Sequence, residues 1–168
     1  VHKQLLQYSN HEKYSDPTNN IVIIIPFRDR HKHYEQFMLN NWERNASIIV
    51  VEQDNKELYR RAWSTNIGIK IAMETYPNAK CIVQHDVDMI PNSNVDYSEC
   101  VTPIQLSSEI QCFGWSVPYI TYTGGVISAS PRHWTLINGM TNNDHHGWGG
   151  EDDELYYRLK QTQLLQSD

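Results

Sequence analysis

The sequence predicts an α/β fold around a mostly parallel sheet, and the order of its apolar segments carries that prediction. Apolar runs at 21–25, 48–51 and 80–85 are typical of strands that are buried on both faces. Between them, apolar residues recur at helical spacing over 34–42 and 58–73. A strand–helix–strand–helix–strand order implies parallel strands joined by right-handed crossovers.

The rest of the chain adds a fourth strand and two more helices. The run 126–129 predicts a strand, and a short helix is expected from Pro131 until the turn residue Gly139. An acid-led segment near the end predicts the last helix. We expect residues 1–20 to be a polar lead-in and 21–168 to form one domain.

The composition narrows the classes of partner. With 168 residues and 39% hydrophobic content, the chain is long enough for one domain with a core. A formal net charge of -6 argues against nucleic acid or an anionic membrane as the main partner. No stretch is long and apolar enough to span a bilayer, and no secretory signal is visible.

Two carboxylates follow directly on the third predicted strand, in Asp86-Val87-Asp88. In extended backbone, residues two apart point the same way, so Asp86 and Asp88 would face one spot at the mouth of the sheet. Ligands of such sheets bind beyond the carboxyl ends of the strands. Converging carboxylates suit a hard divalent cation beside a bound phosphate, although a solvated strand-end turn explains the same pattern.

Basic and aromatic side chains fall at the same predicted edge. Arg28 and Arg30 follow the first strand and are candidates for contacts with a diphosphate. In Tyr59-Arg60-Arg61 an aromatic ring stands beside guanidinium groups. The ring could stack on a nucleobase while the guanidinium groups bind a phosphate. Solvated strand ends or a helix cap account for these residues as well. With a cation on Asp88, they would compose a nucleotide-diphosphate site.

A second acidic cluster follows a Trp among glycines, in 147–154. A helix beginning at the acids explains Glu151 to Glu154 through the helix dipole, but it does not explain three glycines around Trp148. An exposed Trp is a natural stacking surface for a sugar ring or a base. A carboxylate at the helix start can act as general base on an acceptor hydroxyl. Attack opposite a leaving diphosphate would invert the sugar carbon.

Three further features are less informative. His145-His146 could bind a metal, but adjacent histidines in a polar loop are more often solvated. The three cysteines give no disulfide framework by their count alone. Asn45 begins a glycosylation sequon, which has meaning only in a lumenal or secreted chain.

Together these motifs resemble the β-1,4-galactosyltransferase family of Golgi enzymes. They run in that family's order from about residue 21 to residue 160. The matching segments are 24–30, 59–62, 86–91, 113–119, 122–126, 138–139 and 147–154. Each motif is weak alone, whereas the ordered set is highly specific.

The resemblance implies a GT-A-like (Rossmann-like) nucleotide-sugar-binding fold and a metal-dependent hexosyltransferase. The expected reaction moves galactose from UDP-galactose, with inversion, to the 4-hydroxyl of a terminal sugar: N-acetylglucosamine, glucose or xylose on a glycan acceptor. Mn²⁺ is the expected cofactor, with Asp88 as a metal ligand. The expected donor-binding residues are Pro26, Phe27, Arg28, Arg30, Tyr59, Arg61, Asp86, Val87, Tyr122 and Trp148.

On the acceptor side, the resemblance makes Asp152 the catalytic base, with Glu151 and Asp153 as catalytic partners that hold the acceptor. Trp148 would lie on a loop that closes over the donor. Tyr122 falls where the family selects its donor, and a Tyr there is similar to enzymes specific for galactose. The expected acceptor-binding residues are Tyr119, Gly149, Gly150 and Asp153.

The cysteines gain meaning from the resemblance. Cys81 and Cys100 match the spacing of a family disulfide, so we expect them to pair and Cys112 to stay free. A disulfide would place the domain in an oxidising lumen, which predicts the Golgi lumen or a secreted form and makes the Asn45 sequon usable. The domain is expected to make no direct membrane contact, with any membrane anchor lying upstream.

Departures from the family pattern leave other functions open. The family continues beyond Asp168, so a further histidine metal ligand and part of the acceptor pocket are expected to be missing. His146 stands where the common enzymes have Trp. Glu154 is similar to the xylose-directed branch, whereas the cysteine pair favours the N-acetylglucosamine-directed branch, which leaves the acceptor undecided. The alternatives are a β-1,4-N-acetylgalactosaminyltransferase, a non-catalytic UDP-sugar- or glycan-binding domain, and a metal-dependent phosphoesterase.

Overall fold

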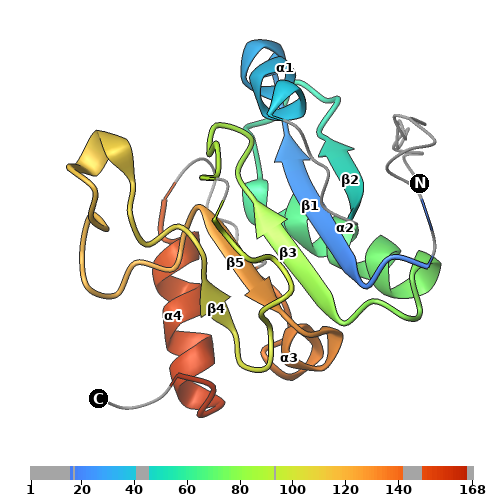
Figure 1. Ribbon diagram of the computed structural model, residues 1–168, viewed down its shortest axis with the longest axis vertical. Helices are drawn as coiled ribbons and strands as arrows, with labels where there is room; N and C mark the ends of the chain where they lie inside the picture. The colour runs from blue at the N-terminus through green and yellow to red at the C-terminus, as the bar shows by residue number, and fades with distance from the viewer. Residues whose placement is uncertain (1–15, 17, 41–45, 93, 142–148, 166–168) are drawn as a thin grey trace.

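A five-stranded mixed sheet in the order β2-β1-β3-β5-β4 forms the centre of the computed structural model (Figure 1). The structure describes residues 16, 18–40, 46–92, 94–141 and 149–165. The strands are β1 Ile21–Phe27, β2 Ala46–Glu52, β3 Cys81–His85, β4 Ile104–Gln105 and β5 Val126–Ala129. Strand β1 pairs in parallel with β2 and β3, whereas β5 is antiparallel to β3 and β4. The predicted α/β fold with a mostly parallel sheet core is confirmed.

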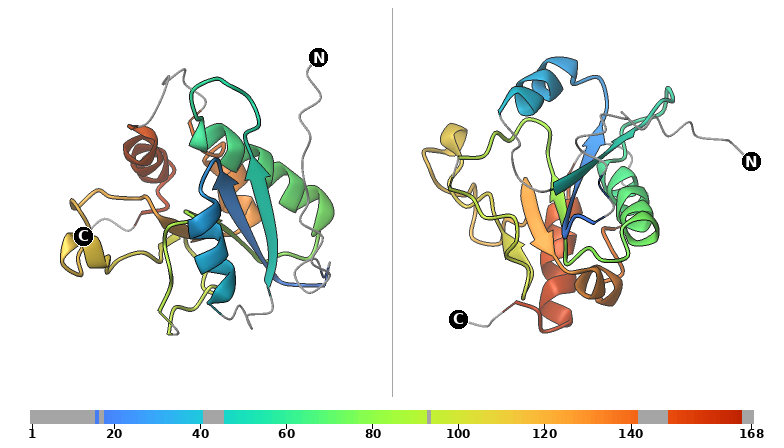
Figure 2. Two further views of the ribbon diagram at one scale, coloured as in Figure 1. Left: turned by 90° about the horizontal axis from the view of Figure 1, so that it is seen from above. Right: turned by 45° about the vertical axis from the view of Figure 1, so that its right-hand side comes forward.

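Helices cover both faces of the sheet. The helical segments are α1 His31–Leu39, α2 Arg61–Thr75, the 3₁₀ turn η2 Gln111–Phe113, α3 Pro131–Leu136 and α4 Glu151–Gln161. Helices α2, α3 and α4 contribute to one hydrophobic cluster with one face of the sheet, and α1 contributes Phe37 to the cluster on the other face. Figure 2 shows the sheet between these layers and the segment with η2 projecting from the β4–β5 edge.

Strand β1 is apolar without alternation because both of its faces are buried. Val22 and Ile24 belong to the cluster that α2 completes, whereas Ile23 and Ile25 belong to the cluster with Phe37. Burial on both faces requires an apolar side chain at every position. This physical requirement is the reason why the strand is legible in the sequence.

Helix α2 packs unusually close to β1. A Cβ on Gly68 would lie 2.3 Å from Ile24 Cγ2, so the absence of a side chain permits this approach. The helix follows β2 and therefore begins at the edge where the parallel strands end. This packing fixes Arg61, its first residue, beside the carboxyl end of β3.

The predicted helical rhythm over 58–73 placed the start of this helix too early. Leu58 is 59% exposed and lies in the loop before α2. The buried Gln53 holds that loop: its Nε2 donates to Leu58 O at 3.0 Å, and its Oε1 accepts the Arg60 N–H at 2.8 Å. The chain after Pro91, predicted to be irregular, contains β4 and η2, which are too short for a periodic signal.

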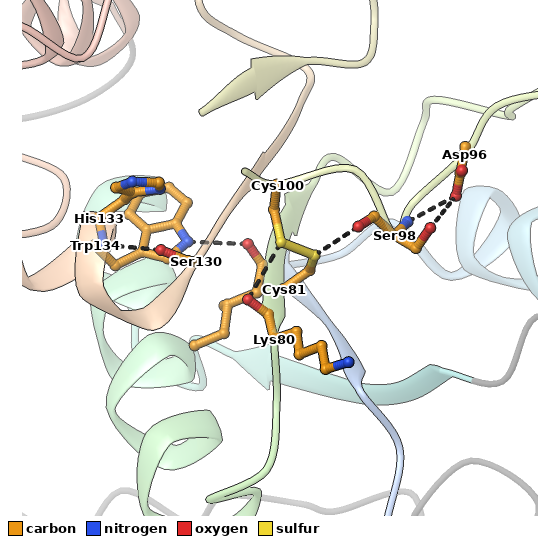
Figure 3. Close-up of a disulfide and its surroundings, with 9 residues drawn as sticks. Lys80, Cys81, Asp96, Ser98, Cys100, Ser130, His133 and Trp134 are labelled. Carbon is orange, nitrogen blue, oxygen red and sulfur yellow. Dashed lines mark hydrogen bonds between the residues drawn. A yellow bond between two sulfur atoms is a disulfide. The ribbon is translucent and has the colours of Figure 1, made fainter. Parts of the chain in front are cut away.

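The disulfide expected between Cys81 and Cys100 is confirmed (Figure 3). Cys112, also as expected, is a free and exposed thiol. Figure 3 shows the disulfide near Lys80 and Ser98. The bridge closes a loop between β3 and the chain before β4, and this loop contains the Asp-Val-Asp segment.

Some predictions concern parts of the chain that the structure does not describe. Trp148, Asn45 and the pair His145-His146 lie outside the described residues. Within the described ranges, no helix combines the length and the apolar character needed to cross a membrane.

Candidate active site

Arg61 joins the two acidic groups that the sequence singles out. Its Nε donates to Asp86 Oδ1 at 2.7 Å, and its Nη1 donates to Asp152 Oδ1 at 2.8 Å. Glu151 Oε1 lies 3.8 Å from the same Nη1. The side chain of Arg61 is only 9% exposed, so these are interactions of low solvent screening. One guanidinium group therefore connects the end of β3 with the start of α4.

The charges of this group are strongly coupled. Burial by itself would lower the pKa of Arg61, but Asp86 and Asp152 outweigh it and raise the pKa, so the guanidinium stays cationic. Burial raises the pKa of Asp86, and Arg61 opposes that rise. Arg61 Nη2 is buried and has no hydrogen-bond partner among the described residues. It is a donor that a bound ligand can satisfy.

The Asp86–Asp88 segment is a turn, and the expectation of extended backbone was wrong. The strand ends at His85, and the Met89 N–H donates to Asp86 O at 3.1 Å. Val87 is buried in the core, whereas Asp88 is exposed. The two carboxylates are still close to each other in this turn. Burial is the main cause of the raised pKa of Asp86, and the nearby charge of Asp88 raises it further.

Gln84 is a site residue that the sequence analysis missed. Its Nε2 donates to Asp86 Oδ1 at 2.9 Å, so this one oxygen accepts from both Gln84 and Arg61. The Asp86 N–H donates to Gly125 O at 2.9 Å. Asp86 is therefore oriented from three sides. The available signal was an amide side chain inside an apolar strand, since buried amides require hydrogen-bond partners.

The acids at the start of α4 have separate partners. Glu151 is buried, and its Oε2 accepts the Gly149 N–H at 3.0 Å. Asp152 pairs with Arg61, and Glu154 pairs with Arg158 at 2.8 Å. Gly150 precedes the helix with a φ of 84°, a conformation that favours glycine. The acids thus form the first helical turn, as expected, while two of them face the buried guanidinium.

Two tyrosines lie beside this turn. The rings of Tyr119 and Tyr122 meet edge to face, with centroids 5.6 Å apart. Burial, followed by a hydrogen bond to Asp153, raises the pKa of Tyr119 to about 12. Burial and then the charge of Asp152 raise the pKa of Tyr122. Both phenols are therefore protonated near neutral pH and offer hydroxyl groups next to the acids.

The predicted donor-binding residues fall into two groups, one beside Arg61 and Asp86 and one at the end of β1. Tyr59 lies near Arg61, Asp86 and Asp88. Burial is the main cause of the raised pKa of Tyr59; the charge of Arg61 lowers this pKa, and the charges of Asp86 and Asp88 raise it. Pro26 and Phe27 are buried in β1 instead.

Phe27 packs edge to face against His31 and Tyr34. Arg28 donates to Glu57 O, and Arg30 is exposed before α1. The side chains of Pro26 and Phe27 thus serve packing, and the donor-binding roles of this first segment stay predictions.

The described residues contain no cluster of three His, Cys, Asp or Glu side chains able to hold a metal. Asp88 supplies one exposed carboxylate, with Asp86 nearby. Divalent cations at phosphate-transfer sites are commonly held by one or two carboxylates together with substrate phosphates and water. The carboxylates of Asp88 and Asp86 thus fit a cation that binds together with a diphosphate.

Sequence comparison identifies the family. Residues 4–101 match the family model described as the N-terminal region of glycosyl transferase group 7, and residues 104–166 match the N-terminal domain of galactosyltransferase. The chain belongs to the β-1,4-galactosyltransferase family. Over 148 residues it is 36% identical to bovine (Bos taurus) β-1,4-galactosyltransferase 1, a match that covers 84% of this chain and 36% of the relative. Human (Homo sapiens) β-1,4-galactosyltransferase 5 is 33% identical, with 92% and 42% covered.

Solved structures of β-1,4-galactosyltransferases share the fold. The catalytic domain of Drosophila β1,4-galactosyltransferase 7 in complex with xylobiose matches with a TM-score of 0.72 and 28% identity, over 86% of this chain and 62% of that one. A variant of that enzyme in complex with manganese, UDP-Gal and xylobiose matches with a TM-score of 0.69. These neighbours confirm the GT-A-like fold. The chain spans about two fifths of the length of the curated relatives it matches.

Proposed function

We propose that this chain carries the site of a Mn²⁺-dependent, inverting galactosyltransferase, which moves galactose from UDP-galactose to the 4-hydroxyl of a terminal sugar. The observation that carries the proposal is that Arg61 hydrogen-bonds both to Asp86, which is predicted to bind the sugar donor, and to Asp152, the predicted base. The family relatives support the reaction, and the Drosophila complex with manganese, UDP-Gal and xylobiose supports the ligands.

In this reaction Asp152 acts as the general base. The acceptor hydroxyl gives its proton to the Asp152 carboxylate while its oxygen bonds to the first carbon of galactose. The bond from that carbon to the diphosphate breaks on the opposite face, and UDP leaves with the electron pair. The result is inversion at the sugar carbon. Arg61 Nη1 donates to Asp152 Oδ1 at 2.8 Å and so orients the carboxylate of the base.

The donor side supplies orientation and charge. When bound, Mn²⁺ neutralises charge on the leaving diphosphate, and Asp88 would hold it. Arg61 and Gln84 both donate hydrogen bonds to Asp86 Oδ1. Within the described chain, no hydrogen bond of this kind reaches Asp86 Oδ2. We assign contacts with UDP-galactose to that oxygen and to Arg61 Nη2, which is buried without a hydrogen-bond partner among the described residues.

The finer specificity rests on the tyrosines and the acids. Tyr122 lies beside Asp152, where a large phenol ring would exclude an N-acetyl group and favour galactose over N-acetylgalactosamine. Tyr119 and Asp153 are hydrogen-bonded to each other and would contact the acceptor. The Drosophila neighbour binds xylobiose, which favours xylose among the three acceptor sugars.

We further propose an oxidising compartment, either the Golgi lumen or the extracellular space. The buried Cys81–Cys100 disulfide supports this location, because such bridges persist where thiols are not kept reduced. N-linked glycosylation of Asn45 would be possible there. Mass mapping of the protein from its native cells tests glycosylation of Asn45, and co-localisation with a Golgi marker or recovery from the medium tests the compartment.

A transfer assay tests the function directly. The protein is incubated with UDP-galactose, with either Mn²⁺ or a chelator, and with N-acetylglucosamine, glucose, xylose or xylobiose in turn. We expect product only with Mn²⁺ and with at least one acceptor, and a β1,4 linkage by NMR. Binding of UDP without transfer to any acceptor would favour a non-catalytic domain, and preference for UDP-N-acetylgalactosamine would favour that alternative donor.

A further inference from the structure

A short segment before β5, residues 123–125, contacts both halves of the site. The Thr123 hydroxyl donates to the main-chain oxygen of Asp152. Two residues later, Gly125 O accepts the Asp86 N–H at 2.9 Å. The segment therefore contacts main-chain atoms of Asp86 and Asp152, the same two residues whose side chains Arg61 joins.

Gly124 provides the space in which the Asp152 carboxylate lies. A Cβ on Gly124 would lie 2.2 Å from Asp152 Oδ2 and 2.6 Å from Tyr122 Cε2. Both distances are shorter than non-bonded atoms tolerate, so a side chain at this position would displace the carboxylate or the ring. The requirement for glycine at this position is steric, since the two side chains approach the backbone itself.

Side chains at the β4 edge brace this segment. Gln105 Nε2 donates to Gly124 O at 2.5 Å, and Ser107 Oγ donates to the same oxygen at 2.9 Å. Ser107 Oγ also accepts the Val126 N–H at 2.9 Å. Because Gly124 O is held by two donors, the surface under Asp152 is fixed by the sheet edge and not by the acid helix alone.

We propose that Thr123 and Gly124 are positioning residues for the base of the transfer, an inference that rests on the proposed function. Asp152 is held at three points: Oδ1 by Arg61, the main-chain oxygen by Thr123, and Oδ2 against Gly124. These three contacts, one from the start of α2 and two from the segment 123–125, fix the direction of the carboxylate. Both residues act through Asp152, so their loss affects turnover more than donor binding.

The first test replaces Thr123 with valine, which removes the hydroxyl and nearly keeps the volume. We expect kcat to fall roughly ten- to hundredfold, as misplacement of a reacting group does, with no change in the Kd for UDP in the presence of Mn²⁺. Thr123→Ser keeps the hydroxyl and should restore kcat. The matched control is Thr135→Val, which removes the same kind of bond, from Oγ1 to Pro131 O, on α3. A Thr123→Val enzyme with normal kcat would overturn the role of Thr123.

The second test, Gly124→Ala, acts on the carboxylate by steric contact. We expect a larger loss of kcat than in Thr123→Val, again with normal UDP binding. Normal turnover in this variant would overturn the role of Gly124.

Hydrogen exchange over residues 151–155 gives a readout that does not depend on turnover. It should become faster in Thr123→Val and Gly124→Ala but not in Thr135→Val. If the wild-type protein transfers no sugar, the proposed function fails together with the catalytic part of this inference. Unchanged exchange in both site variants would overturn the positioning contacts in either case.

Discussion

Arg61 and Asp152 lie 91 positions apart in the sequence, and Arg61 Nη1 donates a 2.8 Å hydrogen bond to Asp152 Oδ1. The same guanidinium bonds to Asp86 through Nε. Because Arg61 begins α2, and Gly68 lets α2 pack closely on β1, the position of this cation is set by the core. The site is thus assembled by three elements around one buried charge.

Removal of that charge should destabilise the fold. Arg61→Met would leave Asp86, Asp152 and Glu151 facing one another without a cation, and removal of one partner from a buried ion pair costs about 3–5 kcal/mol. The free energy of unfolding, measured with urea, should fall by that amount. The matched control is Lys70→Met, which breaks an exposed pair with Glu74 and should cost at most about 1 kcal/mol. Equal effects of the two changes would contradict the central role of Arg61.

Replacement of the base should separate turnover from donor binding. Asp152→Asn keeps the shape of the side chain but cannot accept a proton at neutral pH, so kcat should fall by about 10²–10⁴. The Kd for UDP with Mn²⁺, from calorimetry, should stay close to that of the wild type. Glu74→Gln, the same type of change on the exposed face of α2, is the control. Turnover retained in Asp152→Asn would remove Asp152 from the role of base.

The disulfide should stabilise both the fold and the donor side. Cys81→Ser combined with Cys100→Ser should lower the free energy of unfolding by about 2–4 kcal/mol, since the bridge restrains the unfolded chain. It should also weaken Mn²⁺-dependent UDP binding, because the bridged loop contains the Asp86–Asp88 turn. Cys112→Ser, which removes the exposed free thiol, should change neither quantity. A reduced protein as stable as the oxidised one would contradict this account.

His133 should make stability depend on pH in a defined direction. Burial and then the charge of Arg132 lower the pKa of His133 below 6.5 in the folded state. The unfolded chain therefore binds more protons between that lowered pKa and 6.5, and the free energy of unfolding falls as the pH falls through this window. Urea unfolding at a series of pH values should show a shallower pH dependence in His133→Gln. An unchanged slope would mean that His133 titrates alike in both states.

The parts of the fold that the sequence reveals are those with a periodic physical requirement. The run Ile21–Ile25 is legible because both faces of β1 are buried. The start of α2 was misplaced because Leu58 fits the helical rhythm, whereas the side chain of Gln53 holds that residue in a loop. Strand β4 has only two residues, and hydrogen bonds to β5, rather than any local pattern, define it.

The site was predictable by residue type more than by contact. Asp86, Asp88 and the acids of α4 stand out by their clustering and by family resemblance. Their connection through Arg61 depends on the relative placement of three elements, which no local pattern encodes. Thr123 was missed for the same reason, since its partner Asp152 is distant in the chain. Gln84 was missed although its amide stands out in an apolar strand, because that signal indicates burial and does not identify Asp86 as the partner.

Calorimetric titration of UDP, with and without Mn²⁺, tests the central claim most directly, namely that this chain assembles a metal-dependent nucleotide-sugar site. We expect binding that requires Mn²⁺ and that weakens strongly in Asp88→Asn, whose exposed side chain contributes little to stability. UDP binding of equal strength with and without Mn²⁺, or no binding in either condition, would contradict the account.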